Sequence, residues 1–330
     1  MTLEQLRIFV AVAEREHVTR AAADLNLTQS ATSAAIAALE HRHAVKLFDR
    51  VGRRIALTDA GRLFLQEARA ILTRAAVGEQ VLSDLAGLKR GRLSFAASQT
   101  IGNYWLPQRL AAFRKRHPGI ETPLVIGNTE TVAAAIHDGL ADIGLVEGEI
   151  DDPYLAQEVV ATDTMSIVVA PEHPWSARDA VTPDAFGETS WVLREPGSGT
   201  RQLLETVLRR VGQTIADLDI ALELPANEAV RAAVEAGAGA SLMSRLVFAT
   251  ALRSGVLLEI PVEIPPRRFL MLRQKERYVG RAAQAFRALL DSENLANTSE
   301  HSAHDGGMGR RSDAYSATEP LCRRATGAAW

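Results

Sequence analysis

The chain has 330 residues, which is too long for one small domain and suits two or three. Its single cysteine, Cys322, excludes an internal disulfide framework, and the net charge of −3 by itself says nothing about nucleic acid. No apolar run approaches the roughly 18 residues of a membrane helix, and the charged first helix is not a signal peptide, so we expect a soluble, cytoplasmic protein.

The charge is unevenly distributed along the chain. Residues 1–92 carry 14 Lys and Arg against 10 Asp and Glu, so this part has a charge of +4 and the remainder a charge of −7. A mildly basic N-terminal part is compatible with DNA binding but does not establish it.

Three short helices are predicted within residues 1–40. In the first, the cap is Thr2 and the apolar stripe consists of Leu3, Leu6, Phe9, Val10 and Ala13. The other two occupy 18–40, with a break at Asn26-Leu27 and Thr28 capping the third helix. For the third helix we expect a small inner face of Ala31, Ala35, Ala38 and Leu39. Its first turn would then display Gln29, Ser30, Thr32 and Ser33.

This arrangement favours a helix-turn-helix. A small inner face lets two helices cross closely, while the start of the second helix enters the major groove of DNA. Glutamine can bond an adenine bidentately, and Ser or Thr can contact bases or phosphates. An ordinary alanine-rich helical hairpin with solvated polar residues gives the same local pattern, so the flanking sequence has to decide between them.

A short basic hairpin, or wing, follows the third helix. Leu47-Phe48-Asp49-Arg50 and Arg53-Arg54-Ile55-Ala56-Leu57-Thr58 would form its two sides, and Thr58-Asp59-Ala60-Gly61 opens another helix. Side chains of Arg50, Arg53 and Arg54 are then placed to contact phosphates or an adjacent minor groove.

The segment as a whole resembles the N-terminal domain of the LysR-type transcriptional regulators. The matching residues are Leu6, Phe9, Ala21-Ala22, Leu25, Thr28-Gln29-Ser30-Ala31, Ser33, Ile36, Leu39-Glu40, Leu47-Phe48, Arg50 and Leu57-Thr58-Asp59-Ala60-Gly61. The resemblance implies a winged helix-turn-helix over 1–58 that binds promoter DNA. Its DNA-binding residues would be Thr19, Thr28, Gln29, Ser30, Thr32, Ser33, Arg50, Arg53 and Arg54.

One departure concerns the turn after the third helix. The family usually has Leu-Gly before the Leu-Phe pair, where this chain has His43-Ala44. A left-handed residue costs about 1 kcal/mol more as Ala than as Gly. The turn is therefore expected to be either differently shaped or slightly strained.

A long linker helix is predicted over 59–90. It has a near-heptad apolar stripe of Phe64, Ala68, Ile71, Ala75, Leu82 and Leu85. A single apolar seam on a long helix favours pairing with a second subunit, and a two-fold dimer presents two recognition helices to two half-sites. The alternative is a helix packed on its own body. The resemblance implies a homodimer or homotetramer and contact with RNA polymerase.

Beyond Gly91 the pattern changes to alternating strands and helices, which predicts parallel βαβ units. The first series has strands at Leu93-Ala97, Pro123-Ile126 and Asp142-Val146, with a helix holding Leu106 and Phe113 and a helix 132–140 between them. The second series has strands at Met165-Ala170, Trp191-Leu193 and Ser241-Met243, with helices 200–211 and 227–236. Phe269-Leu272 and a helix 282–290 then return to the first subdomain. The overall class is α/β.

These two series resemble the family's effector domain, which is built like a type 2 periplasmic binding protein. That domain would span 91–291, with lobe I at about 91–161 and 268–291 and lobe II at about 162–267. Residues 292–330 are polar without apolar periodicity and are expected to be a disordered tail.

Ligands of open α/β sheets collect at the carboxyl ends of strands, beside helix N-termini. Three polar stretches have this position: Ser98-Gln99-Thr100, Asn128-Thr129 and the loop Arg194-Glu195-Pro196-Gly197-Ser198-Gly199-Thr200-Arg201. The last has glycines, hydroxyls and an arginine, which suit a small anion, although a Gly-rich connection that merely caps a helix looks the same. With the resemblance, we expect an effector site of Ser98, Gln99, Thr100, Thr129, Ser198, Thr200 and Arg201. Glu147 and Glu228 could line the same cleft, where they would repel an anion or accept from a ligand hydroxyl, but ordinary surface roles are expected for them.

The sequence offers little for an enzyme. No Ser/His/Asp grouping, metal-ligand spacing or nucleotide-binding glycine motif is present, so we expect no catalytic residues, metal or cofactor. A solute-binding protein or an enzyme with an accessory helical domain is the alternative. It would leave residues 1–90 without a purpose.

Overall fold

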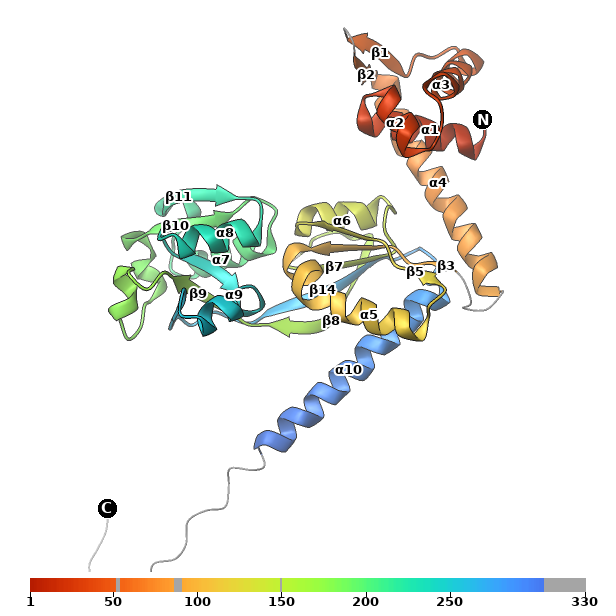
Figure 1. Ribbon diagram of the computed structural model, residues 1–330. Coiled ribbons are helices and arrows are strands. Elements are labelled where there is room, and N and C mark those ends of the chain that lie inside the picture. Colours follow the sequence, from red (N-terminus) through yellow and green to blue (C-terminus); the bar gives the residue numbers. More distant parts are fainter. Residues whose placement is uncertain (52–53, 86–90, 149, 306–330) are drawn as a thin grey trace, which may run out of the picture. The chain divides into compact units, whose positions relative to one another are not determined.

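The computed structural model describes residues 1–51, 54–85, 91–148 and 150–305 (Figure 1). Within these ranges, the side chains at 51, 54, 80, 83 and 294–305 lie outside the description. Among the described residues, no helix combines the length and apolarity needed to span a membrane.

The N-terminal domain is a three-helix core with a two-stranded wing. Its helices are α1 (Leu3–Arg15), α2 (Val18–Asp24) and α3 (Gln29–His43), and the wing pairs β1 (Phe48–Val51) with β2 (Arg54–Leu57) antiparallel. Thr2 caps α1 in a reciprocal capping box with Gln5. The core residues that these elements share are Leu6, Ile8, Phe9, Val12, Ala21, Ile36, Leu39 and Leu47.

The inner face of α3 differs from the predicted one. The buried residues are Thr32, Ile36, Leu39 and Glu40, whereas Ala31 and Ala38 are exposed. Of the predicted face, Leu39 is buried and Ala35 is half-buried against the core, so the prediction is wrong at Ala31 and Ala38. Burying the larger Ile36 and Leu39 side chains removes more apolar surface from water than burying alanines, and this sets the rotation of the helix.

The turn after α3 keeps the left-handed shape despite lacking glycine. Ala44, the C-cap, has φ +52° and ψ +34°, and its N–H bonds the carbonyls at the end of the helix. Of the two expectations for this turn, the strained one therefore holds: the shape is retained and the alanine takes an unfavourable backbone conformation.

Helix α4 (Asp59–Leu85) follows the wing as one uninterrupted helix. Ala68 and Val77 are buried along it, while Leu63, Leu82 and Leu85 are 70%, 68% and 78% exposed. Several large apolar side chains of this helix are thus without cover within the chain.

Lobe I is built on a five-stranded sheet in the order β6-β4-β7-β14-β8. The strands are β4 (Phe95–Ser98), β6 (Leu124–Gly127), β7 (Ile143–Glu147), β8 (Leu155–Asp163) and β14 (Arg267–Gln274). β4 is parallel to β6 and β7, whereas β14 runs antiparallel to β7 and β8. A short pair, β3 (Gly91–Arg92) and β5 (Ile120–Glu121), lies beside it.

The helices of lobe I are α5 (Leu106–Arg116), α6 (Thr129–His137) and α10 (Arg281–Asp305), with a π-helical turn at Ile101–Trp105 before α5. Phe95, Phe113 and Phe286 meet edge to face in the core, which joins β4, α5 and α10. The C-terminal helix thus completes the lobe that began nearly 200 residues earlier.

Lobe II holds two small sheets. β9 (Met165–Val169) lies between β12 (Ser241–Ser244) and β13 (Leu258–Ile260) in antiparallel pairing, and β10 (Ser190–Arg194) pairs parallel with β11 (Asp219–Leu224). The helices are α7 (Gly199–Arg210), α8 (Asn227–Glu235) and α9 (Arg245–Arg253). Short 3-10 turns occupy Pro174–Ala177, Pro183–Glu188 and Ile215–Asp217.

Both lobes therefore mix parallel and antiparallel strands, where the alternation predicted parallel units. The prediction also missed β8, β11, β13 and α9. In β8 and β11 the apolar side chains alternate with polar ones or face outward, so neither strand forms the continuous apolar run of a buried parallel strand.

Residues 292–305 differ from the disordered tail expected over 292–330. Helix α10 continues to Asp305, so residues 292–305 are helical. A helix that has started against a packed core adds one backbone hydrogen bond for each further residue, and apolar periodicity is not required for that. Residues 306–330, including Cys322, lie outside the described residues.

Candidate functional site

The first turn of α3 displays its polar side chains to solvent. Thr28 caps the helix by accepting the Ala31 N–H at 3.2 Å, and its hydroxyl lies 3.1 Å from that of Ser30. Gln29 is exposed, and its amide donates to the Ser33 hydroxyl at 3.1 Å. Thr19 is exposed on the neighbouring α2. These residues have the accessibility that contact with DNA requires.

Thr32 does not belong with them. Its side chain is fully buried, and its hydroxyl donates to the backbone carbonyl of Thr28 at 3.1 Å. The prediction that Thr32 contacts DNA is therefore wrong, because the helix is rotated from the expected phase. On the wing, Arg50 is exposed. Arg53 lies outside the described residues, and of Arg54 only the backbone, in β2, is described.

Glu40 fixes the wing to α3. Its carboxylate accepts the N–H groups of Leu47 at 2.8 Å and Phe48 at 3.2 Å, and pairs with Lys46 at 2.9 Å. Burial alone would raise the pKa of Glu40, but the bonds from Lys46 and the two backbone N–H groups outweigh it and hold the pKa below its usual value. Charge-assisted hydrogen bonds from Glu40 therefore hold the residues at the start of the wing against α3.

A second polar site lies where the two lobes meet. Arg267, at the start of β14, is 4% exposed at its side chain and donates to hydroxyls from both lobes. These are Thr100, at 3.2 Å, and Thr200, at 3.0 Å. The same guanidinium pairs with Asp163 at 2.8 Å and lies 3.4 Å from Glu147. The site thus centres on a buried arginine that the sequence analysis did not single out.

Glu147, at the end of β7, is 3% exposed, so the expected surface role is wrong and the side chain takes the alternative position in the cleft. Ser98 donates a hydrogen bond to its carboxylate, and Thr129 donates to its backbone carbonyl at 2.5 Å. A Cβ added to Gly199 would lie 1.9 Å from that carbonyl oxygen, so only glycine lets α7 approach the strand so closely.

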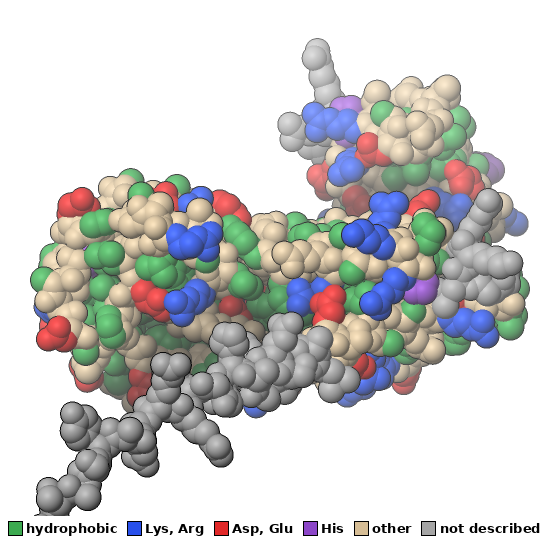
Figure 2. All heavy atoms as spheres, turned by 60° about the horizontal axis from the view of Figure 1, so that its bottom comes forward, with side chains coloured by type: hydrophobic (Ala, Val, Ile, Leu, Met, Phe, Trp, Pro, Cys, Tyr) green, Lys and Arg blue, Asp and Glu red, His purple; other side chains and the backbone are tan. Residues whose placement is uncertain are grey.

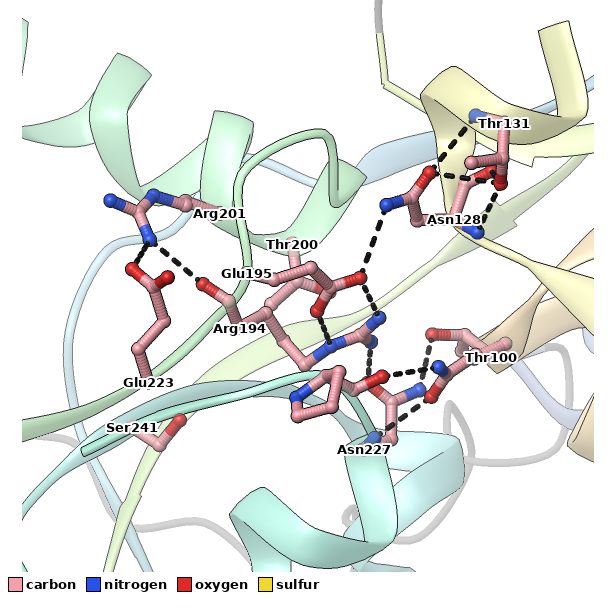
Figure 3. A network of polar contacts seen from close by, with 12 residues as sticks. Thr100, Asn128, Thr131, Arg194, Glu195, Thr200, Arg201, Glu223, Asn227 and Ser241 are labelled. Atoms are coloured by element: carbon pink, nitrogen blue, oxygen red, sulfur yellow. Dashed lines mark hydrogen bonds and ion pairs between the residues drawn. The ribbon is translucent and has the colours of Figure 1, made fainter. Parts of the chain in front are cut away.

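Several hydrogen bonds cross directly between the lobes (Figure 3). The Gln99 amide donates to the Pro225 carbonyl at 2.6 Å and accepts the Asn227 N–H at 2.9 Å, while the Asn227 amide donates to Thr100 at 3.1 Å. Asn128 reaches Glu195 at 3.2 Å. In this structure the lobes are closed against each other by polar contacts.

A buried arginine of lobe II joins the same network. Arg194 is 4% exposed at its side chain and pairs with Glu195 at 2.7 Å. It also donates to the Asn227 side chain. Burial would raise the pKa of Glu195, but the bond and charge of Arg194 hold that pKa below its usual value.

Arg201 is placed differently from the expectation. Its guanidinium donates to the Arg194 carbonyl at 3.0 Å and pairs with Glu205 and Glu223, all within lobe II. Figure 3 shows it directed toward Glu223 and away from Thr100. An arginine already paired with two carboxylates is a poor receptor for an effector anion. The structure therefore does not support Arg201 as an anion ligand.

Ser198 is buried at the N-cap of α7 and makes no side-chain capping bond. The site so assembled contains Ser98, Gln99, Thr100, Thr129, Ser198 and Thr200 from the predicted set, together with Arg267, Asp163, Arg194 and Asn227, which the sequence analysis missed. Burial raises the pKa of Asp163 although Arg267 opposes it.

Arg194 opens the predicted loop but was not assigned to the site, whereas Arg267, Asp163 and Asn227 had no local signal. Arg267 bonds Thr100 across 167 positions of sequence, and no spacing rule joins residues so far apart. On the face shown in Figure 2, Lys and Arg side chains are interspersed with Asp and Glu, so the surface charge seen there does not mark the site either. Within the described ranges, no three His, Cys, Asp or Glu side chains gather in a group that could hold a metal ion.

The winged helix-turn-helix and the two-lobed domain place the chain in the class of DNA-binding regulators that carry a ligand-binding domain. Family models agree: a bacterial regulatory helix-turn-helix protein of the lysR family matches residues 3–62, and a LysR substrate binding domain matches 86–294. The chain belongs to the LysR family of transcriptional regulators.

Individual relatives cover most of the chain. The RuBisCO operon transcriptional regulator of Allochromatium vinosum is 34% identical over 89% of this chain and 96% of its own. Full-length CbnR, solved with its target DNA, has a TM-score of 0.65 at 22% identity, covering 88% of this chain and 99% of that one. The CcmR regulatory domain of Synechocystis PCC6803, solved with 2-PG, has a TM-score of 0.57 at 22% identity, covering 62% and 97%.

Proposed function

We propose that this LysR-type regulator binds double-stranded promoter DNA in the cytoplasm as a homodimer or homotetramer. A small anionic metabolite between the lobes would change how the subunits are arranged, and with it the contact with RNA polymerase. The observation that carries the DNA-binding half is the exposed first turn of α3, where Gln29 and Ser30 are accessible to base edges. CbnR, of similar fold, was solved on its target DNA, which supports this assignment.

The effector half rests on the interlobe site. The hydroxyls of Thr100 and Thr200 come from opposite lobes and lie on the same buried guanidinium. A ligand that contacts both therefore links its own binding to the arrangement of the lobes. The CcmR domain, of similar fold, was solved with 2-PG, which supports a small-molecule ligand for this type of domain.

Oligomer formation is supported by the uncovered apolar side chains of α4. Leu63, Ile71, Leu82 and Leu85 are all exposed, and at about 100° per residue their spacing places them within one arc of about 100°. We expect Leu82→Asp to weaken the dimer and operator binding together. Analytical ultracentrifugation would measure the first. A dimer that is unchanged in this variant would place the interface elsewhere.

The test of the proposed function has two independent arms, both with the full-length protein. Selection from a random duplex library followed by gel shift asks whether the protein prefers a DNA sequence. A thermal-shift screen against sulfite, sulfate, phosphate, 2-PG and dicarboxylates asks for a ligand. An anion at 100 times its Kd should stabilise the fold by about 2.7 kcal/mol. If the protein prefers no DNA sequence, the DNA assignment is refuted. If none of the anions shifts the melting temperature, the anionic effector is refuted.

A further inference from the structure

We propose that a cavity between α4 and lobe I is a second small-molecule site, which takes a zwitterionic metabolite with an apolar side chain, such as an apolar amino acid. The cavity has a volume of about 650 Å³, within the range of small-ligand pockets, and none of its lining residues belongs to the interlobe site. Residues of α4 line one side, and β3, β5 and the segments next to α6 and α10 line the other. The proposal goes beyond the proposed function, because it concerns neither the DNA-binding turn nor the interlobe site.

Contacts at two of the lining residues, Asp84 and Gly139, hold α4 against lobe I. The buried Asp84 carboxylate, near the end of α4, accepts the N–H of Arg281, the first residue of α10, at 2.9 Å. About three turns earlier on α4, Thr73 packs on Gly139, where an added Cβ would lie 2.4 Å from the threonine Cγ2. The two sides of the cavity are therefore joined at separate points, which gives it a defined width.

The cavity uses a different face of α4 from the one proposed for the dimer. At about 100° per residue, Leu72, Ala76 and Glu79 each lie at least about 60° outside the arc of exposed leucine and isoleucine side chains. A second copy of the chain that packs on that arc therefore leaves this face of α4 accessible to a small molecule.

One part of the wall is apolar. Leu72 and Ala76 are at i and i+4 spacing on α4, so they share one side of the helix. Ile120 and Leu140 belong to the facing wall of lobe I, and Leu140 is 52% exposed. A ligand with an aliphatic or aromatic side chain would remove this leucine from water, which favours binding.

Donors for a carboxylate come from lobe I. The terminal nitrogens of Arg277 are taken, since they donate to the Ala141 carbonyl at 3.0 Å and pair with Asp142 at 2.7 Å. Its Nε is buried and meets no acceptor among the described residues. Arg92 of β3 is exposed and pairs with no carboxylate of the described chain. A carboxylate suits both groups, because it satisfies a buried donor and forms charge-assisted hydrogen bonds with a guanidinium.

Acceptors for an ammonium group come from both sides of the cavity. Glu79 of α4 and Glu121 of β5 are exposed, and neither pairs with a Lys, Arg or His side chain of the described ranges. The other two carboxylates of the wall, Asp84 and Asp142, are already bonded within the protein. Three arginines line the cavity against four carboxylates, a difference of one charge. A ligand that carries both charges complements such a wall better than a simple anion or a simple cation does.

The first experiment is calorimetric titration of the full-length protein with leucine, methionine and phenylalanine as free amino acids. At least one of them should bind. Its methyl ester and its N-acetyl form should each bind about 10-fold to 100-fold more weakly, because each lacks one charged hydrogen-bonding group. The proposal is wrong if none of the three amino acids binds, or if a blocked form binds as well as the free amino acid.

The second experiment tests whether the ligand lies in this cavity. Arg92→Gln and Glu121→Gln should each weaken binding of the best amino acid about tenfold or more, since each removes a charge from the wall. The matched control is Arg114→Gln on α5, which removes an exposed arginine outside the cavity and should leave the affinity unchanged. All three positions are exposed, and thermal unfolding checks that each variant is folded. Variants at 92 and 121 that bind like the unaltered protein would overturn the proposal and leave the proposed function untouched.

Discussion

The start of α3 and the seam between the lobes are built from the same kinds of side chain, yet they are in opposite states. At α3, Gln29 and Ser30 are exposed, and their side chains bond Ser33 and Thr28 of the same short stretch. At the seam, Thr100 and Thr200 are buried and bonded to a guanidinium from a third segment of chain. Under the proposed function, the first surface would meet DNA and the second a small ligand.

The residues of the two sites differ in how far apart they lie in the sequence. The DNA-binding turn is made by consecutive residues of one helix, so a single substitution there should alter recognition without harming the fold. The interlobe site is held by a buried ion cluster, so its central substitution should cost stability first. The four predictions below test that contrast, beginning with the largest effect.

Arg267→Met should destabilise the effector domain by about 3–5 kcal/mol, because it leaves Glu147 and Asp163 as buried charges without their partner. Denaturant unfolding followed by tryptophan fluorescence would measure it. The neighbouring Arg268 is exposed, and Arg268→Met should change stability by less than about 0.5 kcal/mol. Similar costs for the two variants would show that the buried cluster is not what holds the seam.

Gln29→Ala should cost about 1–3 kcal/mol of binding to the selected operator and much less on random duplex, because base contacts carry the preference. Fluorescence anisotropy at fixed salt on both DNAs gives the ratio. Thr32→Val is the internal control: its hydroxyl is buried against Thr28, so the ratio should stay unchanged. An equal loss on both DNAs for Gln29→Ala would mean that Gln29 does not read bases.

Glu40→Gln should destabilise the wing by about 1–2 kcal/mol at neutral pH, since a charge-assisted anchor becomes a neutral one. The lowered pKa of Glu40 stabilises the fold above the pKa of the unfolded chain, and this stabilisation is lost as the pH falls through the folded value. The variant and the unaltered protein should therefore converge in acid. Amide hydrogen exchange of peptides covering 44–57 would show whether they do.

Ala44→Gly should give the smallest effect and the only gain, about 0.5–1 kcal/mol of stability, because glycine adopts the left-handed turn without strain. Hydrogen exchange of peptides covering 44–57, followed at increasing temperature, would measure the stability of the N-terminal domain. Loss of stability would show that the freedom gained by the unfolded chain outweighs the relieved strain.

Much of the fold was predictable because its signals are local. The capping threonines of α1 and α3, the break at Asn26-Leu27 and the apolar stripe of α1 each lie within one or two helical turns. The apolar runs of the buried strands β4, β7, β9 and β10 are likewise local signals. Where the local signal was weak, as in the alternating β8 and the outward-facing β11, the prediction failed.

Local patterns thus identify the kind of protein: a winged helix-turn-helix, a long helix and a two-lobed domain, with polar residues at strand ends. Which of those residues act together follows from tertiary packing. Whether Thr32 faces DNA or the core depends on the packing of Ile36 and Leu39 against other helices. Whether Arg201 or Arg267 serves the seam depends on how β14 returns beside β7 and β8, since a buried charge takes its partners from whatever the fold brings within about 3 Å.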